Sequence, residues 1–348
     1  GNSLLFSLYL PDDPEAALVS LDRGIEAAPD SPALHLLKVG LLQNLQRWEA
    51  AEVALLDLRE QFPDDKSVDY RLVNFYTGRD RLDDAQEVLE RMMAQYPDDM
   101  TVRLEYAEFL ANNRDPEIAE EKLVGFAEDY PEAYDFRFAL ATLYEALQRP
   151  DEAVAEYEKI IDAAESGESA VNARNRLARL YLRQGDLDSA RPLIDAVLEE
   201  SPSDPDALTM RASLAMDAGD LDEAIVDLRS VYRSDPQSER ALTLLAQAHL
   251  SAGDTTLARD RLRELLGAHP DSVFARDNLV ALLLQTNDVP QAQQVLETSE
   301  APETLNSTRL RVEVLMRQRA FGEAREAAKV LVDEERTRVS GLYRGGRS

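Results

Sequence analysis

The stretch PDALTMRASLAMDAGDLDEAIVDLRSVYRSDPQS, residues 205–238, decides the fold of this chain. Small and aliphatic residues recur in it at intervals of three and four, the spacing that places side chains on one face of an α-helix. Two such stripes follow each other, the first made of Leu208, Ala212 and Ala215 and the second of Ala224, Leu228 and Val231. The stretch therefore predicts two consecutive amphipathic helices.

The residues between and after the two stripes predict where the helices end. Gly219 suits the left-handed conformation that often terminates a helix, and Asp220 can cap the helix that follows. Asp222 and Glu223 then fall in the first turn of the second helix, where acidic side chains complement the helix dipole. Pro236 disfavours helix at the residue before it, so the second helix should stop there.

The same unit recurs along the whole chain. Its landmark is a small residue early in the second helix, which returns every 34 residues apart from one gap of 37 and a last gap of 32. The residues at this position are Ala17, Ala51, Ala85, Ala119, Ala153, Ala190, Ala224, Ala258, Ala292 and Ala324. Two helices that cross closely leave room for little more than a methyl group. A fixed period of this length predicts stacked helix–turn–helix units, and hence an all-α solenoid.

On these positions the chain resembles the tetratricopeptide repeat (TPR) family, which has the same period. The resemblance covers roughly residues 4–332 and includes a first-helix aromatic residue, as at Tyr76, Tyr144 and Tyr181. It implies a right-handed α-solenoid of about nine full units with partial ends. It also implies a non-enzymatic role, in which a protein or peptide binds along the concave face that the first helices line.

The chain departs from the family pattern in two ways. The first-helix tryptophan is missing throughout, and the single tryptophan, Trp48, falls at a turn between helices. The second small residue of the second helix is replaced by larger ones, namely Leu58, Met92, Phe126, Ile160, Val197, Val231 and Leu265. Larger residues at a helix crossing change the spacing between repeats, so we do not transfer the family's superhelical pitch to this chain.

Charge narrows the class of partner. The chain has 67 acidic and 38 basic residues, a formal net charge of −29, whereas binding to phosphates depends largely on Lys and Arg. This argues against a nucleic-acid partner, and with it against an RNA-binding pentatricopeptide array. Cysteine is absent, which excludes disulfides and thiolate metal sites. Arginine greatly outnumbers lysine, which favours a GC-rich bacterial genome.

The compartment is less well defined by the sequence. No apolar run reaches the length of about 18 residues that a membrane span needs, and no signal peptide is recognisable. The chain opens at Gly1 within what resembles a half-finished helix, so we expect a processed or truncated N-terminus. Localisation stays open, with the periplasm or cell envelope favoured over the cytoplasm.

One insertion divides the predicted array into two parts. Three residues are added within the stretch 163–169, where Gly167 replaces the usual proline. We expect N-terminal units over residues 1–165 and C-terminal units over residues 166–335, with either a bend or a longer surface loop between them. Residues 336–348 form a basic tail without acidic residues. We interpret it as a frayed end or the start of a further repeat, or alternatively as a peptide that docks on the acidic body.

Sequence signals for catalysis or cofactor binding are missing. The three histidines, His35, His249 and His269, share no metal-like spacing with acidic residues, and His249 falls at the aromatic core position. No nucleophile elbow, phosphate-binding loop, zinc-protease motif or dinucleotide fingerprint occurs. We therefore predict no enzyme activity, no metal site and no cofactor.

A strip of arginine and asparagine residues is the best candidate for a binding surface. It follows helical spacing on the predicted concave face of the unit after the insertion, at Asn172, Asn175, Arg176, Arg179 and Arg183. In so acidic a chain, such a strip could bind a carboxylate, a peptide C-terminus or an anionic polymer through paired hydrogen bonds. The alternative is that Arg176 and Arg179 pair with acids of the adjacent units.

A second candidate lies in an earlier unit, where Tyr70, Arg71 and Asn74 stand at comparable positions. The two-carboxylate clamp that some TPR co-chaperones use needs Lys, Asn and Arg distributed over three successive units. No three consecutive units supply that set here. A chaperone-tail adaptor is therefore disfavoured.

These observations predict a protein–protein interaction scaffold that holds a peptide or partner protein in a preformed concave groove. The resemblance to long bacterial TPR arrays suggests cell-envelope assembly or exopolysaccharide secretion as its setting. Two alternatives remain open. One is a cytosolic regulatory module that senses a peptide, and the other is an assembly subunit that self-associates through incompletely capped terminal units.

Overall fold

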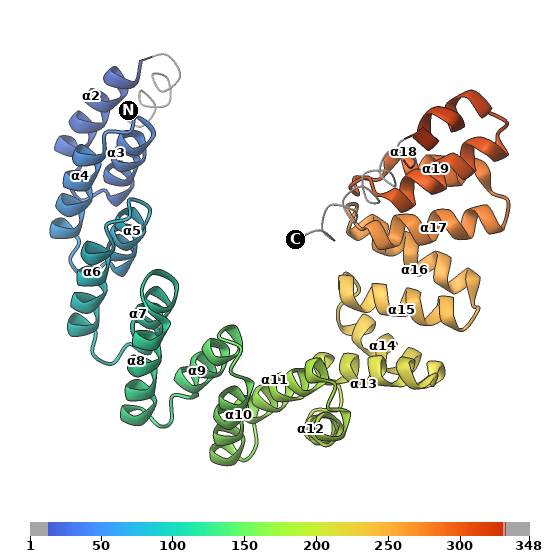
Figure 1. The fold of residues 1–348 in the computed structure, drawn as a ribbon. Helices are drawn as coiled ribbons and strands as arrows, with labels where there is room; N and C mark the ends of the chain where they lie inside the picture. Colours follow the sequence, from blue (N-terminus) through green and yellow to red (C-terminus); the bar gives the residue numbers. More distant parts are fainter. Residues whose placement is uncertain (1–12, 330, 332–348) are drawn as a thin grey trace, which may run out of the picture. The chain divides into compact units, whose positions relative to one another are not determined.

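The computed structural model of the protein describes residues 13–329 and 331, and every regular element within them is a helix. The chain forms two compact units, one ending at Asp162 and the other beginning at Ala163. Each is a stack of helix pairs (Figure 1). The predicted all-α array of helix–turn–helix repeats is thus confirmed. The half-helix expected at the N-terminus and the basic tail 336–348 lie outside the described residues.

In the first unit, the described residues start at α2, a second helix, and continue in pairs. Its helices are α2 (Pro14–Ala27), α3 (Pro32–Asn44), α4 (Trp48–Gln61), α5 (Lys66–Thr77), α6 (Leu82–Gln95), α7 (Met100–Asn113), α8 (Pro116–Asp129), α9 (Tyr134–Ala146) and α10 (Pro150–Ala164). The odd-numbered helices are the first helices of their repeats, and the even-numbered ones are the second helices.

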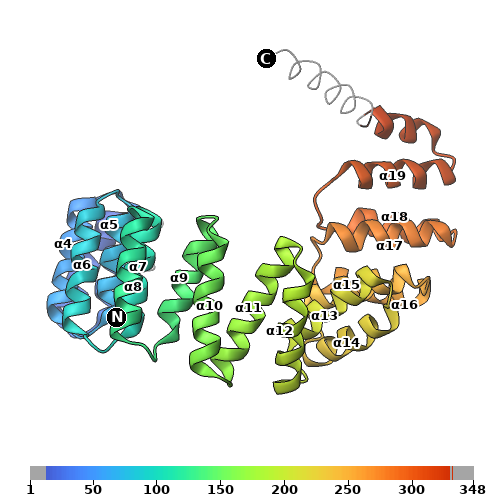
Figure 2. The ribbon, with the colours of Figure 1, turned by 60° about the horizontal axis from the view of Figure 1, so that its bottom comes forward.

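The second unit continues the same alternation. Its helices are α11 (Glu168–Gln184), α12 (Leu187–Glu200), α13 (Pro205–Ala218), α14 (Leu221–Ser234), α15 (Glu239–Ser251), α16 (Thr255–Ala268), α17 (Val273–Gln285), α18 (Val289–Thr298) and α19 (Leu305–Arg317), followed by helical residues 321–329. Neighbouring first helices touch, α11 contacting α13 and α13 contacting α15 (Figure 2).

The turns within repeats follow the predicted backbone but not the predicted cap. Gly219 ends α13 in the left-handed region at φ 88°, as expected. Asp220 does precede α14, yet its carboxylate accepts no capping hydrogen bond, so that prediction is wrong. Instead its backbone N–H donates to the carbonyl of Ala215 at 2.8 Å. The main chain therefore closes this turn without help from the Asp220 side chain.

The recurring alanines lie at the centre of each helix pair. Nine of the ten have no exposed surface, and the tenth, Ala324, is 2% exposed. The larger residues that depart from the family pattern are buried beside them, except that Phe126 is half-buried. In every described repeat, the two helices thus cross closely at the methyl group of this alanine.

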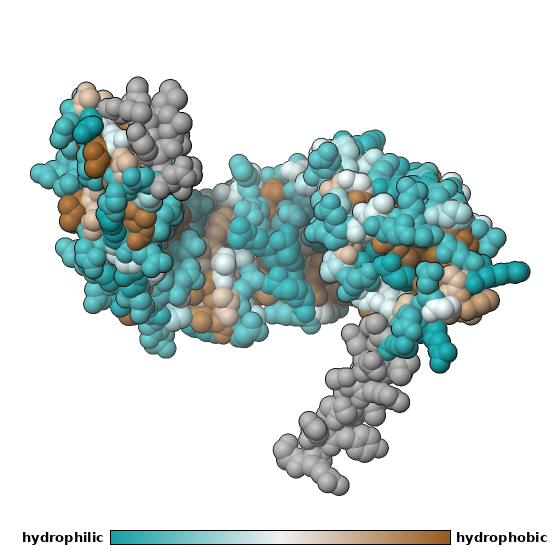
Figure 3. Space-filling view, turned by 90° about the horizontal axis from the view of Figure 1, so that it is seen from above, coloured by the Kyte–Doolittle hydropathy of each residue, from teal (hydrophilic) through white to brown (hydrophobic). Residues whose placement is uncertain are grey.

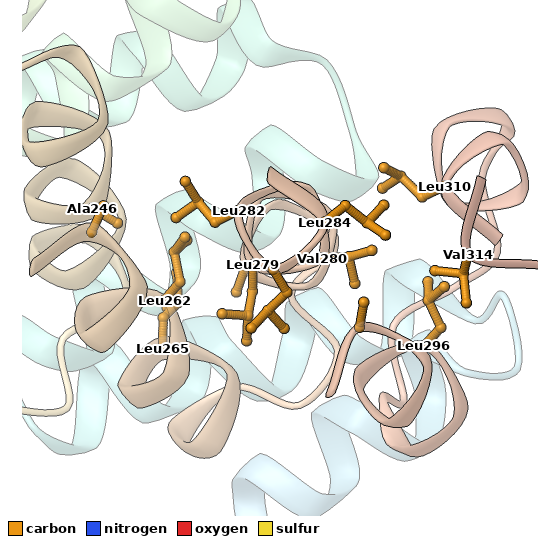
Figure 4. Packing of buried hydrophobic residues seen from close by; sticks show 14 of the residues in the cluster. Ala246, Leu262, Leu265, Leu279, Val280, Leu282, Leu284, Leu296, Leu310 and Val314 are labelled. Atoms are coloured by element: carbon orange, nitrogen blue, oxygen red, sulfur yellow. The ribbon is translucent and has the colours of Figure 1, made fainter. Parts of the chain in front are cut away.

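The buried core of the second unit extends across neighbouring repeats. In the second unit Leu262 of α16, Leu279 of α17, Leu296 of α18 and Leu310 of α19 belong to one buried cluster (Figure 4). Burial of a leucine side chain contributes about 2 kcal/mol relative to exposure. Because each helix is covered by its neighbours, no repeat could bury its apolar face alone. The face seen in Figure 3 is mostly hydrophilic, as the composition requires.

The insertion lengthens helices and leaves the loop short. α10 has 15 residues and α11 has 17, whereas α12, α13 and α14 have 14 each. The connection between α10 and α11 is residues 165–167, one residue shorter than the connection 201–204. The alternative of a longer surface loop is therefore wrong. Gly167, at φ 91°, takes a conformation that suits glycine at the start of α11.

Candidate functional site

The predicted strip lies on α11, along what we call the first-helix face, the surface that α11, α13 and α15 share in the second unit. Asn172 and Arg183 are exposed, and Arg176 and Arg179 are half-buried. Arg176 Nε donates to Asn172 Oδ1 at 3.0 Å, one turn away on the same helix. This bond holds a guanidinium group on the helix surface.

Arg179 connects the strip to the next repeat. Its guanidinium lies 2.9 Å from Asp206, in the first turn of α13, and the two side chains are 40% and 52% exposed. An ion pair this open to water contributes little to stability. The alternative that these arginines pair with acids of adjacent units holds for Arg179, but the pair stays accessible to a competing carboxylate.

Asn175 belongs to the interior and not to the exposed strip. It is 5% exposed, and its Nδ2 donates to Asp204 Oδ1 at 3.1 Å. The same oxygen accepts the backbone N–H of Ala207 at 2.8 Å, so Asp204 caps α13 while Asn175 holds it. Asn175 therefore connects two repeats. A ligand on the first-helix face would contact the other residues of the strip, and not Asn175.

A shallow pocket of about 320 Å³ continues the first-helix face beyond the strip. It is lined by Ser213 of α13 and by Glu239, Arg240, Thr243 and Leu244 of α15. The sequence interpretation missed these residues. The signal that could have found them is the period itself, because Arg240 and Thr243 stand two 34-residue steps after Asn172 and Asn175.

The second candidate lies on α5 in the first unit, in more acidic surroundings. Arg71 and Asn74 are exposed, whereas Tyr70 is half-buried. Burial raises the pKa of the Tyr70 hydroxyl, and the negative charges of Glu105 and Asp99 raise it further. Burial and a neighbouring carboxylate also raise the pKa of Glu105. An anionic ligand is therefore less favoured here than on α11.

The histidines occupy packed positions. His249 is 3% exposed, which agrees with its predicted core position, and burial lowers the pKa of its imidazole. His35 Nε2 lies 3.0 Å from the carbonyl of Pro29, and His269 Nε2 lies 2.9 Å from that of Gln237.

Across residues 13–329, no group of three or more His, Cys, Asp or Glu side chains is arranged to hold a metal ion. No helix in that range combines the length and apolar character needed to cross a bilayer.

Comparison with known structures shows the fold. A structure of Naa15/Naa10 bound to HypK is similar over 94% of this chain and 65% of that chain, at 17% identity and a TM-score of 0.58. PilF of Pseudomonas aeruginosa is similar over 58% of this chain and 90% of its own, at 16% identity and a TM-score of 0.50. The Cut9–Hcn1 hetero-tetramer of APC/C matches 86% of this chain at 14% identity and a TM-score of 0.49, and this chain spans 59% of its length.

Comparison of the sequence gives the family. A search of curated proteins found no match. Models of the tetratricopeptide repeat match residues 8–72, 67–109, 134–199, 175–239 and 215–283. These matches agree with the period, the buried alanines and the helix pairs described above. The chain belongs to the tetratricopeptide repeat family.

Proposed function

We propose that the protein is a non-enzymatic scaffold that binds an extended, carboxylate-bearing peptide on the first-helix face of its second unit. TPR proteins bind proteins or peptides and are generally non-catalytic scaffolds, so interaction with a protein partner is the general role of this chain. The contact residues that we assign to the α11 strip are Asn172, Arg176, Arg179 and Arg183.

One observation carries this proposal: the accessible ion pair between Arg179 and Asp206 leads from the strip on α11 onto α13. Ser213, two helical turns after Asp206, lines the pocket that α13 shares with α15. Arginine side chains and a pocket with apolar, hydroxyl and charged groups thus follow one another on neighbouring helices. An extended peptide could place a carboxylate on the first and a side chain in the second.

The chemistry favours a carboxylate as the recognised group. Guanidinium groups bind carboxylates through two parallel hydrogen bonds, and Arg176 is already oriented by Asn172. A ligand carboxylate would compete with Asp206 for Arg179, and the half-exposed pair offers little resistance. Because α11, α13 and α15 contact one another within the second unit, little ordering is required on binding.

Tyr70, Arg71 and Asn74 are proposed as a separate contact on α5 of the first unit. Its acidic neighbours, Glu105 and Asp99, favour a peptide that also carries a positive charge. A partner that occupied this surface would therefore differ in charge from the one bound on α11.

A capture experiment tests the α11 strip. The full chain and its Arg176→Glu/Arg179→Glu variant would be immobilised and exposed to lysate of the source cell. We expect a partner that the wild-type chain retains and the folded variant loses. Arg191→Glu is the matched control, because Arg191 is an exposed arginine on the second helix α12. Equal capture by all three chains would show that the strip is structural.

For the setting we propose cell-envelope assembly, including exopolysaccharide secretion, on the basis of the resemblance to long bacterial arrays. Fractionation of the source cells, followed by detection of the chain with an antibody, tests this. Recovery with envelope fractions is expected. Recovery in the cytosol together with a peptide that alters a regulatory output would favour the regulatory module instead.

A further inference from the structure

A pocket of about 480 Å³ opens between α14, α15 and α16, three helices of the second unit. Two of them are second helices, so this pocket is separate from the first-helix face. Charged and aliphatic side chains line it together: Arg229, Arg233, Arg261, His249, Val226 and Leu257. We call it the arginine pocket. Three arginines therefore line one cavity of a chain whose net charge is −29.

The preceding repeat provides an internal reference. A smaller pocket of about 230 Å³ lies between α12, α13 and α14, one 34-residue step earlier, and it is lined by Asp195 and Glu223 among others. In the arginine pocket the corresponding residues are Arg229 and Leu257. One acid is thus replaced by a base, and a second acid by an aliphatic side chain.

An ion pair made by a lining residue of the reference pocket is also lost. There Arg211 donates from two nitrogens to the two carboxylate oxygens of Asp227, both at 2.8 Å. One step later these positions hold Leu245 and Arg261. In the reference pocket, the carboxylate of Asp227 neutralises Arg211. In the arginine pocket, a leucine stands in place of that arginine and an arginine in place of that aspartate, so apolar surface is added and the positive charge has lost this carboxylate.

The guanidinium groups of the arginine pocket are only partly matched by protein acids. Arg261 lies 2.8 Å from Glu264 and 4.8 Å from the centre of the Tyr232 ring. Arg233 Nε donates to the carbonyl of Arg229 at 3.2 Å. Within the described part of the chain, neither Arg229 nor Arg233 has a carboxylate oxygen within 4.0 Å. Two cationic groups are therefore available to a ligand.

His249 of α15 contributes a buried ring nitrogen to the lining of this pocket. Its imidazole is 3% exposed, and its Nδ1 has no hydrogen-bond partner among the described residues, with Asp254 Oδ2 3.5 Å away. Burial lowers the pKa of His249 most, the nearby Asp254 carboxylate opposes this, and the charges of Arg229 and Arg261 lower the pKa further. A buried polar atom without a good partner marks a place where a ligand or water is needed.

The rim supplies the apolar half of the pocket. Val226 is 64% exposed and Leu257 is 38% exposed, on neighbouring second helices. Exposed aliphatic residues beside cationic groups favour a ligand that carries both a carboxylate and an aliphatic side chain. The volume is within the range of pockets that hold small groups of side-chain size.

We propose that the arginine pocket binds an acidic segment of a partner protein in which a carboxylate is adjacent to an aliphatic residue. Arg229 and Arg233 receive the carboxylate, and the aliphatic side chain lies between Val226 and Leu257. This is a second binding site, on the second-helix side of the array, and it does not depend on the function proposed for the first-helix face.

The test uses the full chain and the acetylated, amidated hexapeptide Leu-Asp-Leu-Asp-Leu-Asp, with binding measured by calorimetry. Arg229→Asp and Leu257→Glu each install the residue found at the corresponding position of the reference pocket. Each should weaken binding about tenfold or more. Arg191→Gln, which removes an exposed arginine from the reference pocket, is the matched control and should leave binding unchanged. Unfolding midpoints verify that all variants fold.

Further measurements with altered peptides identify which chemical groups the arginine pocket binds. A peptide with Asn in place of Asp, or with Ser in place of Leu, should bind at least about tenfold more weakly. Because the first-helix face is also proposed to bind a carboxylate-bearing peptide, the arginine pocket is measured in the variant Arg176→Glu/Arg179→Glu as well. Hexapeptide binding should persist in that variant and should be lost when Arg229→Asp is added. The proposal is overturned if the Asn peptide binds equally or if Arg229→Asp has no effect. It is also overturned if sedimentation shows that the chain self-associates and that Arg229→Asp abolishes this self-association.

Discussion

Tyr76 Oη donates a hydrogen bond to Glu52 Oε1 at 3.0 Å, joining the first helix of one repeat to the second helix of the repeat before it. Two repeats later, Tyr144 makes the same bond with Glu120 at 3.0 Å. In both places an arginine donates to the same glutamate at 2.6 Å and lies 4.6 Å from the centre of the tyrosine ring. The chain thus repeats a polar connection between repeats as well as an apolar core.

Removing one hydroxyl from this connection should cost measurable stability. Tyr76→Phe deletes the bond to Glu52 and leaves the ring in place, so we expect a loss of about 1 kcal/mol. Tyr144→Phe should cost a similar amount, and the two losses should add because the sites lie two repeats apart. Urea unfolding followed by circular dichroism measures both.

The matched control for these variants is Tyr134→Phe. Tyr134 is half-buried, and its hydroxyl makes no hydrogen bond with any described residue. This variant should change stability by less than about 0.5 kcal/mol. If all three variants lose the same amount, the connection contributes nothing specific and the losses reflect ring packing alone.

Alkaline pH should reveal the same connection. Burial, reinforced by the hydrogen bond to a glutamate, raises the pKa of Tyr76, Tyr106 and Tyr144 to about 12 each, from an ordinary value of 10.0. A folded-state pKa above the unfolded value gives stability that is complete below pH 10 and is lost as the pH rises toward 12. Burial also raises the pKa of Tyr70 and Tyr96, but less, so Tyr76, Tyr106 and Tyr144 should be the last of the 12 tyrosines to ionise in a titration followed by tyrosinate absorbance.

Two results bear on that pH prediction. The Tyr76→Phe/Tyr144→Phe variant should retain a smaller late-ionising fraction and show a weaker loss of stability between pH 10 and 12. Ionisation of all tyrosines in one step near pH 10, with the chain still helical, would contradict it.

The repeat landmarks could be predicted because their causes are local. Ala224 is buried where two adjacent helices cross. Gly219 ends its helix in the left-handed conformation, which glycine adopts more easily than other residues. Both are determined by residues within one 34-residue unit. The capping role given to Asp220 was wrong, although Asp186, at the same place one repeat earlier, has the same backbone hydrogen bond and does cap its helix. The residue type and the backbone bond of the turn therefore do not decide whether the side chain caps.

The parts that could not be predicted depend on contacts between repeats. Asn175 has the spacing of an exposed strip residue, yet its partner Asp204 lies 29 residues away and holds it inside. The arginine pocket draws residues from three helices, so no single helical stripe contains it. It becomes visible in the sequence only when Asp195 and Asp227 are compared with Arg229 and Arg261 one period later.

Asn175 and Asn172 should therefore behave differently when truncated. Asn175→Ala removes the donor to Asp204 and weakens the cap of α13, for an expected loss of about 1 to 2 kcal/mol. Asn172→Ala changes an exposed side chain and should cost less than about 0.5 kcal/mol. Only Asn172→Ala should weaken capture of a partner by the first-helix face. Equal losses of stability from the two variants would place Asn175 on the surface.

Two neighbouring alanines on α4 test whether the period reflects helix crossing. Ala51 has no exposed surface, whereas Ala50, one residue before it, is exposed. Ala51→Leu adds three carbon atoms where two helices meet, so we expect a loss of about 1 to 3 kcal/mol and lowered protection from hydrogen exchange in α3 and α4. Ala50→Leu adds the same atoms toward water and should change stability by less than about 0.5 kcal/mol. If both variants were equally stable, the interior would have space to spare at the crossing. The recurrence of alanine at this position would then need a cause other than close packing.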